Sequence, residues 1–268
     1  MLPFLRIGPF TLQAPGLALL VGVWIGSSLA EKEAARLKLN ANDIYNLIFY
    51  GLMAGIVGAR LVYAAQYLSV YLANPWSLIA LTPATLSPNA GLIVGIAVAA
   101  LFGWRKRLPL RRTLDALTPG LAAFMVALGV AHFLSGDAFG TPSRLPWSIY
   151  LWTEYRHPWQ IYETLAALIV FLFIRKRPYG LTGDGLIFLL FVALSAFARV
   201  LLEPFRGDSA ITAVGFRSTQ VISLILLAGS LGLLDHWLRS GQRKSTTPEV
   251  NQNGLDQTSP RGNMVDKG

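Results

Sequence analysis

The amino-acid sequence predicts an all-α polytopic membrane protein with seven transmembrane helices. Of its 268 residues 53% are hydrophobic and only 14% are charged, whereas a soluble domain carries about 25% charged residues. The apolar residues form runs close to the roughly 20 residues that a helix needs to cross the hydrocarbon core. Basic residues gather between these runs, which is typical of membrane topology. The net charge of +9 is therefore explained without a nucleic-acid partner, and we expect none.

Each apolar run is expected to form one transmembrane helix. The first run begins soon after Arg6 and is long enough to span, so no cleavable signal peptide is expected. The third and fifth runs are short, which predicts little tilt or an extension by interfacial residues. The predicted spans are Leu12–Ala30, Ile44–Gln66, Asn89–Trp104, Leu114–Leu134, Trp159–Ile174, Gly185–Leu202 and Ser218–Leu238.

The segments between the spans alternate in positive charge. Because basic residues are enriched on the cytoplasmic side, the pattern predicts an external N-terminus and a cytoplasmic C-terminus. The residues assigned to the cytoplasmic side are Lys32, Arg36, Lys38, Arg105, Lys106, Arg107, Arg111, Arg112, Arg175, Lys176, Arg177, Arg239, Arg243 and Lys244. Those assigned to the outer side are Arg6, Arg144, Arg156, Arg206 and Arg217.

The chain divides into a transmembrane domain over residues 1–240 and a polar tail over residues 241–268. The tail lacks apolar periodicity, which predicts a disordered cytoplasmic segment. The sequence has no cysteine, so disulfides, thiolate metal sites and a nucleophilic cysteine of the protein's own are excluded. We expect neither a metal nor a cofactor. No internal repeat is evident, although many transporters have one.

Polar residues at the start of the fifth span form the most informative segment. Arg156–Glu163 reads Arg-His-Pro-Trp-Gln-Ile-Tyr-Glu and lies directly against the apolar run Thr164–Ile174. An ionisable group inside a bilayer is costly, so Glu163 indicates a functional site or a paired structural one. The aromatic residues of the preceding loop, Ser135–Pro158, are interpreted as a belt at the lipid headgroups.

Polar residues of the other spans also gather in the predicted outer half of the membrane. This distribution predicts one outward-facing site. Alternatives stay open for single residues, since Arg60 could extend to the headgroups, His132 could be a structural histidine and His157 could begin a helix. The residues in question are Arg60, Asn89, His132, Asp137, His157, Gln160, Tyr162, Glu163, Arg199, Glu203 and Arg206.

Three charged residues end the sixth span. Arg199, Glu203 and Arg206 are spaced by four and three positions, which places them on one face of a helix. One carboxylate between two guanidinium groups leaves donors for a phosphate or carboxylate. The alternative is a structural ion pair between Arg199 and Glu203.

These residues resemble a known family. Arg156–Glu163 is similar to the RHPSQLYE motif of bacterial prolipoprotein diacylglyceryl transferases, and the segment 198–206 resembles their FRxxxExxR motif. The resemblance extends over residues 6–235. It implies seven helices in the bacterial cytoplasmic membrane with an external N-terminus.

The resemblance also implies an activity and its participants. Such enzymes move a diacylglyceryl group from phosphatidylglycerol, a membrane lipid, to the lipobox cysteine of a prolipoprotein that carries a signal peptide. We expect catalytic roles for His157, Arg199 and Glu203, which lie in the matching motifs, and for His132, which departs from the family pattern. The residues expected to bind lipid or phosphate are Arg60, Asn89, Asp137, Gly140, Gln160, Tyr162, Glu163 and Arg206.

The chain departs from the family pattern at the end of the fourth span. The family signature GRxGNFxNxExxG aligns with residues 128–140, where Phe133 and Gly140 persist. The signature arginine becomes Gly129, the two asparagines become His132 and Ser135, the glutamate becomes Asp137, and the histidine of a separate HGG motif becomes Asn89. His132 could replace the lost histidine as a base.

Three functions are therefore considered. The first is a diacylglyceryl transferase, with the arginines on the phosphate and a histidine transferring the proton. The second is a non-catalytic homologue that binds anionic phospholipid, which the changed signature favours. The third is a transporter, which the confinement of polar residues to the outer half disfavours.

Overall fold

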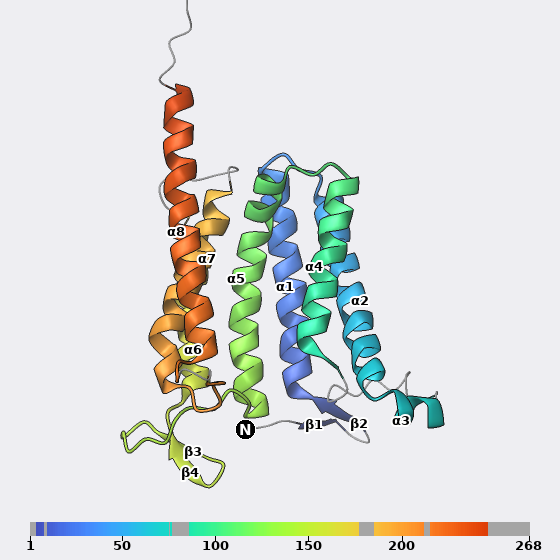
Figure 1. Ribbon diagram of the computed structural model, residues 1–268, viewed down its shortest axis with the longest axis vertical. Coiled ribbons are helices and arrows are strands. Elements are labelled where there is room, and N and C mark those ends of the chain that lie inside the picture. The colour runs from blue at the N-terminus through green and yellow to red at the C-terminus, as the bar shows by residue number, and fades with distance from the viewer. Residues whose placement is uncertain are drawn as a thin grey trace, which may run out of the picture.

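The computed structural model describes residues 4–7, 10–74, 76, 86–176, 185–211 and 215–245, and these form a bundle of long helices (Figure 1). Two small hairpins lie at one end of the bundle, whereas α8 extends beyond it at the other end (Figure 1). The long helices are α1 Ala14–Arg36, α2 Ala41–Gln66, α4 Pro88–Arg105, α5 Leu110–Ser135, α6 Trp159–Arg175, α7 Leu186–Leu202 and α8 Ser218–Ser245.

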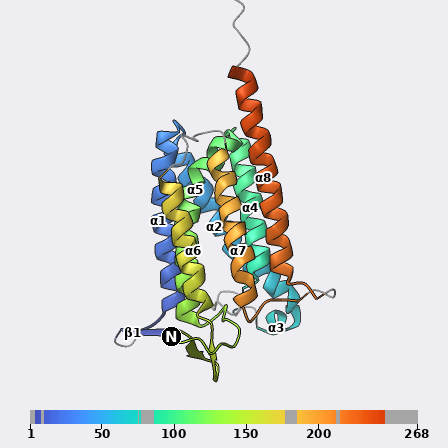
Figure 2. The same cartoon turned by 90° about the vertical axis from the view of Figure 1, so that its left-hand side faces the viewer.

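Each predicted span corresponds to one long helix. In the described part of the chain, six helices are long and apolar enough to cross a membrane: α1, α2, α4, α5, α8 and the continuous stretch Leu186–Phe205. Helix α6 has 17 residues and lies alongside α5 and α7 (Figure 2). The prediction of a helical, polytopic membrane protein is confirmed.

Helix ends follow local sequence signals. The side chain of Asn40 caps α2 by accepting a hydrogen bond from the N–H of Asn42 at 3.0 Å. Helix α5 ends at Gly136, which adopts a φ of 84°, a conformation that glycine reaches without steric cost. Helix α7 ends at Leu202, and Glu203–Phe205 forms a 3-10 turn, η4. Pro204 explains this end, because proline has no N–H to continue the helix.

Small residues let helix pairs approach closely. Helix α1 packs against α5, where a Cβ on Gly120 would overlap the carbonyl oxygen of Gly26. Helix α2 packs against α4 through Gly51 and Gly55, and a Cβ on Gly55 would lie 3.0 Å from the carbonyl oxygen of Gly91. These glycines therefore serve close helix packing, as small residues commonly do between membrane helices.

Four features differ from the sequence prediction. Strands β1 (Phe4–Ile7) and β2 (Phe10–Gln13) pair antiparallel before α1, and a short helix α3 (Leu68–Ala73) follows α2. Strands β3 (Ile149–Leu151) and β4 (Glu154–Arg156) form a second hairpin within the loop predicted as an aromatic belt. Helix α8 continues to Ser245, past the predicted boundary at residue 241. Residues 246–268 of the predicted tail lie outside the described residues.

Candidate functional site

The carboxylate of Glu163 links three helices. Glu163 lies in the first turns of α6, and its Oε2 is 2.7 Å from Nδ1 of His132 on α5. Its Oε1 accepts a hydrogen bond from Nη1 of Arg199 on α7 at 3.0 Å. The side chain of Glu163 is only 9% exposed. Because a buried charge is costly unless it is paired and hydrogen-bonded, this double contact explains how the carboxylate is accommodated.

Gly129 makes the contact between α5 and α6 possible. A Cβ at this position would overlap Oγ1 of Thr164 and lie 3.0 Å from its Cα. His132 is three residues farther along α5, so it lies on the same helix face. The glycine that replaces the signature arginine therefore brings α5 close enough for His132 to contact Glu163.

Arg199 also pairs with Glu203, as the spacing predicted. Nε of Arg199 lies 3.3 Å from Oε2 of Glu203, whose side chain is completely buried. That oxygen has an ion-pair partner but no aligned hydrogen bond among the described residues. The other carboxylate oxygen accepts a hydrogen bond from Oγ of Ser209 at 2.7 Å.

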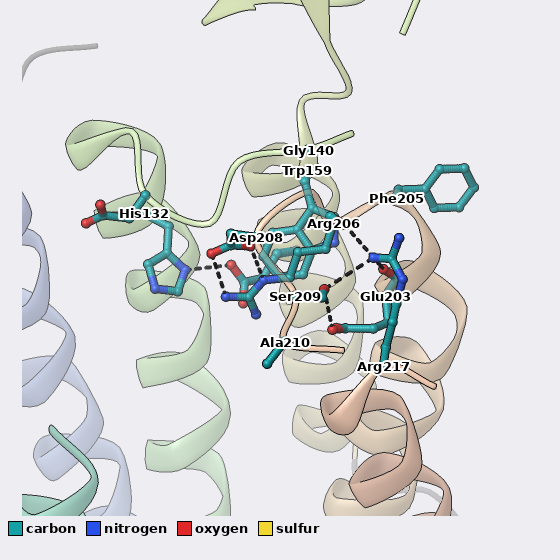
Figure 3. A network of polar contacts seen from close by, with 12 residues as sticks. His132, Gly140, Trp159, Glu203, Phe205, Arg206, Asp208, Ser209, Ala210 and Arg217 are labelled. Atoms are coloured by element: carbon teal, nitrogen blue, oxygen red, sulfur yellow. Dashed lines mark hydrogen bonds and ion pairs between the residues drawn. The ribbon is translucent and has the colours of Figure 1, made fainter. Parts of the chain in front are cut away.

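Arg217 closes this side of the network. Its Nη1 donates to the carbonyl oxygen of Glu203 at 2.7 Å and to Oγ of Ser209 at 3.2 Å. The same nitrogen also contacts the carbonyl oxygen of Arg206. Figure 3 shows Arg217, Ser209 and Glu203 on one side of the network and His132 on the other. The start of α8 is thus joined to the end of α7.

Arg206 does not share Glu203 with Arg199, so the predicted arrangement on one helix face is wrong. The chain leaves the helix at Pro204, and Arg206 has extended backbone angles of −83° and 131°. Its guanidinium group instead donates two hydrogen bonds to the carboxylate of Asp208, from Nε to Oδ1 at 2.5 Å and from Nη2 to Oδ2 at 3.0 Å. The hydrogen bond to Asp208 raises the pKa of Arg206 although burial opposes it. Burial favours a higher pKa for Asp208, but the hydrogen bond and charge of Arg206 prevail and lower that pKa.

Trp159 holds the two arginines together. Its side chain is fully buried, and its Nε1 donates to the carbonyl oxygen of Leu202 at 3.1 Å. The guanidinium carbons of Arg199 and Arg206 each lie 4.9 Å from the centroid of its ring. Contacts of this kind are favourable because the ring face is negative. Figure 3 shows Trp159 and Arg206 in the middle of the network.

A strap from α5 to β3 covers this end of the site. Gly140 pairs with Arg206 in a β-bridge, and its carbonyl oxygen accepts a hydrogen bond from Nη1 of Arg156 at 3.2 Å. A Cβ on Gly140 would overlap the carbonyl oxygen of His157. Gly140 is therefore required for close backbone packing, and its contact with lipid stays a prediction.

The other residues of the Arg156–Glu163 segment have separate surroundings. The ring of His157 lies 5.1 Å from that of Phe205, and its Nδ1 is buried with no hydrogen-bond partner among the described residues. Nε2 of Gln160 donates to the carbonyl oxygen of Asp137 at 2.9 Å. The hydroxyl of Tyr162 accepts a hydrogen bond from Nε1 of Trp147 at 2.7 Å. These contacts position the strap and the hairpin.

Two predicted site residues lie elsewhere. Arg60 belongs to α2, and its guanidinium carbon is 5.6 Å from the ring centroid of Tyr71. Asn89 is exposed in the first turn of α4. Helices α2 and α4 pack chiefly against each other, and α2 also packs against α1, whereas the network is built by α5, α6 and α7. The predicted convergence of polar residues therefore holds for His132, Glu163, Arg199, Glu203 and Arg206.

A shallow groove opens beside Glu163 and Arg199. Its polar lining comes from these two residues and Ser195, whereas the rest of its wall is apolar. The apolar wall includes Ala122, Met125, Ala166, Val170 and Phe191. The groove therefore joins an ionic end to an apolar end.

The arrangement supports acid–base and anion chemistry. The contact with Glu163 orients the ring of His132, which leaves its Nε2 for proton transfer. The arginines provide donors for a phosphate. Among the described residues no group of three His, Asp or Glu side chains could hold a metal ion.

Sequence reasoning missed four residues of the network. Arg217 was counted only as a topological charge, and Trp159 only as part of the Arg156–Glu163 segment. Asp208 and Ser209 follow the arginine motif directly, and their proximity in sequence to Arg206 was a signal. Their roles depend on the turn after Pro204, which is a property of the fold.

Comparison with known proteins gives consistent matches over the whole bundle. A family model described as prolipoprotein diacylglyceryl transferase matches residues 3–235. A phosphatidylglycerol–prolipoprotein diacylglyceryl transferase from Trichormus variabilis is 30% identical over 262 residues, which cover 91% of this chain and 91% of the relative. Proteins with the same name from Nostoc sp. and Thermotoga maritima are 29% and 30% identical, covering 93% and 88% of this chain and 94% and 84% of the relatives.

Proposed function

The chain belongs to the prolipoprotein diacylglyceryl transferase family, and we propose that it performs the family's reaction at the network centred on Glu163. It is a transferase that moves the diacylglyceryl group of phosphatidylglycerol to a prolipoprotein. The acceptor is the thiol of the prolipoprotein's lipobox cysteine, and the absence of cysteine from this chain is consistent with a nucleophile that the substrate supplies. A thioether forms and glycerol phosphate leaves.

The contact between His132 and Glu163 carries the proposal. A thiol must lose its proton to become a nucleophile. With the proton of Nδ1 donated to Glu163 at 2.7 Å, Nε2 of His132 has a free lone pair to accept the thiol proton. Glu163 positions the ring and stabilises the imidazolium that forms. His157, whose Nδ1 is buried without a partner among the described residues, is the weaker candidate for this role.

The arginines stabilise the leaving phosphate. As the bond from the glycerol carbon to the phosphate oxygen breaks, negative charge develops on the phosphate, and preorganised donors lower the barrier. The guanidinium groups of Arg199 and Arg206 are both held at the Trp159 ring, each 4.9 Å from its centroid. Glu203 is a positioning residue for Arg199. The apolar groove beside Glu163 and Arg199 takes an acyl chain of the lipid.

The membrane topology that the basic residues predict supports an outward-facing site. We infer seven crossings with the N-terminus outside, α6 included, in the bacterial cytoplasmic membrane. The transferase domain then occupies residues 1–240, followed by a cytoplasmic tail. This orientation puts the network, which lies towards the hairpin end of the bundle (Figures 1 and 3), in the outer leaflet. A prolipoprotein held by its signal peptide presents its cysteine at the same depth.

A non-catalytic lipid-binding homologue is the second candidate. The replacement of the signature arginine by Gly129 favours it, whereas the His132–Glu163–Arg199 contacts oppose it. The test is to incubate the purified protein with phosphatidylglycerol and a lipobox peptide and to follow the peptide by mass spectrometry. A diacylglyceryl adduct is expected, and it should be lost in Arg199→Ala. Since one oxyanion donor contributes about 10²–10³ in rate, the assay must be sensitive over that range. Lipid binding without any adduct would favour the second candidate.

A further inference from the structure

Asp208 occupies the donors that a phosphate would use. Two nitrogens of Arg206 face its two carboxylate oxygens, at 2.5 Å and 3.0 Å. This bidentate geometry is the one in which a guanidinium group binds either a carboxylate or a phosphate. The side chain of Asp208 is 28% exposed, so it is in contact with the surroundings of the protein.

Asp208 is also the most easily moved acid of the network. Glu163 on α6 and Glu203 at the start of η4 are only 9% and 0% exposed. Removing either from its arginine would leave a buried charge unpaired. Asp208 lies on the loop after η4, where its carboxylate can turn into solvent without that cost.

The backbone beside Asp208 is fixed, which limits any exchange to the side chain. The N–H of Gly207 donates to the carbonyl oxygen of Phe139 at 2.8 Å, and the N–H of Thr141 donates to the carbonyl oxygen of Phe205 at 2.9 Å. A Cβ on Gly207 would lie 2.6 Å from the carbonyl oxygen of Gly140. Rotation of the Asp208 side chain therefore frees Arg206 without moving it away from Trp159.

We propose that Asp208 holds the place of the lipid phosphate on Arg206, leaves when the phospholipid binds, and returns when the glycerol phosphate departs. This inference rests on the proposed function. The exchange conserves charge, because a phosphodiester and a carboxylate each carry one negative charge. It also assists product release, because a phosphate monoester carries about −1.5 to −2 charges at pH 7 and would otherwise stay on the arginine.

The proposal is tested by the affinity of the full-length protein for phosphatidylglycerol in neutral detergent micelles. Asp208→Asn removes the competing charge, and we expect binding up to about fivefold tighter, the range set by the energy of a partly exposed ion pair. Glycerol phosphate should also inhibit turnover at lower concentration in this variant. Glu154→Gln is the matched control, since Glu154 pairs with Arg156 at 2.8 Å on the hairpin, and it should change neither value.

Unchanged or weaker lipid binding by Asp208→Asn overturns the exchange. The result would then mean that Asp208 only holds Arg206 in place. Asp208→Ser provides a second variant with the same expectation if the asparagine variant is unstable. Arg206→Gln distinguishes a wrong phosphate site from a wrong exchange. If this variant binds phosphatidylglycerol like the parent, the phosphate site of the proposed function is wrong; if it loses binding while Asp208→Asn gains none, only the exchange is wrong.

Discussion

Nδ1 of His132 lies 2.7 Å from Oε2 of Glu163, across the contact between α5 and α6. The histidine stands where the family signature has an asparagine, and the glutamate ends the segment that resembles the family's first motif. A carboxylate that orients an imidazole is the arrangement by which many enzymes prepare a general base. The contact that His132 makes with Glu163 therefore supports the proposed activity, although the residue departs from the family signature.

Removal of the imidazole should abolish proton transfer while the fold persists. For His132→Ala we expect a fall in kcat of about 10²–10⁴, the usual contribution of a general base. Added imidazole should restore part of the rate. The exposed His236 of α8 supplies the control, and His236→Ala should be as active as the parent. Full activity of His132→Ala in the peptide mass assay would remove His132 from the mechanism.

Loss of the buried carboxylate charge at position 203 should destabilise the protein. Glu203→Gln leaves Arg199 with less compensation in a buried site, and breaking such a pair costs about 3–5 kcal/mol. Asp235→Asn is the matched control, because Asp235 and Arg239 have the same helical spacing at 2.9 Å with both side chains exposed, and exposed pairs contribute about 0.2–1 kcal/mol. Thermal unfolding in detergent measures both, and equal melting temperatures for the two variants would contradict the role of Glu203.

A side chain at position 129 should separate α5 from α6. The Cβ of Gly129→Ala would overlap Thr164, and such overpacking costs about 1–3 kcal/mol. The activity should fall as well, because His132 moves with α5. At Gly229 of α8 nothing lies within 4 Å of a built Cβ, so Gly229→Ala should not lower the melting temperature. A Gly129→Ala protein that melts and reacts like the parent would show that the helix contact is looser than described.

Acid should remove the contribution of the Arg206–Asp208 pair. The pKa of Asp208 is lowered from its usual 3.8 in the folded protein, so the unfolded chain binds its proton first as the pH falls. The pair therefore stabilises the fold fully above that unfolded value and loses this effect as the pH drops through the lower folded pKa. The melting temperatures of the parent and of Asp208→Asn should differ at neutral pH and converge below about pH 3.8. A difference that stays constant down to pH 3 would exclude ionisation of Asp208 as its cause.

The orientation in the membrane can be tested with fusions. A reporter that is active only outside the cytoplasm should be silent when it is fused after Arg243 in α8 and active when inserted at Thr153, in the turn between β3 and β4. A strong signal after Arg243 would reverse the topology and place the Glu163 network on the cytoplasmic side.

The sequence by itself determined the helices and the family. Span length and charge between spans are short-range properties of the chain, so the predicted runs agree with helices such as α2, predicted to end at Gln66 and observed to end there. The pair of Arg199 and Glu203 was also predictable, because a spacing of four residues fixes their proximity within a helix.

Only the tertiary structure decided which charges meet. Arg206 pairs with Asp208 because Pro204 ends the helix before it, and Trp159 contacts both arginines because α6 packs on the end of α7. Arg60 and Asn89 have the same predicted depth as the site, yet they belong to the α2–α4 pair. The position of a residue along its apolar span predicts its depth in the membrane. The lateral position of a helix, in contrast, depends on side-chain packing between helices that are distant in the chain.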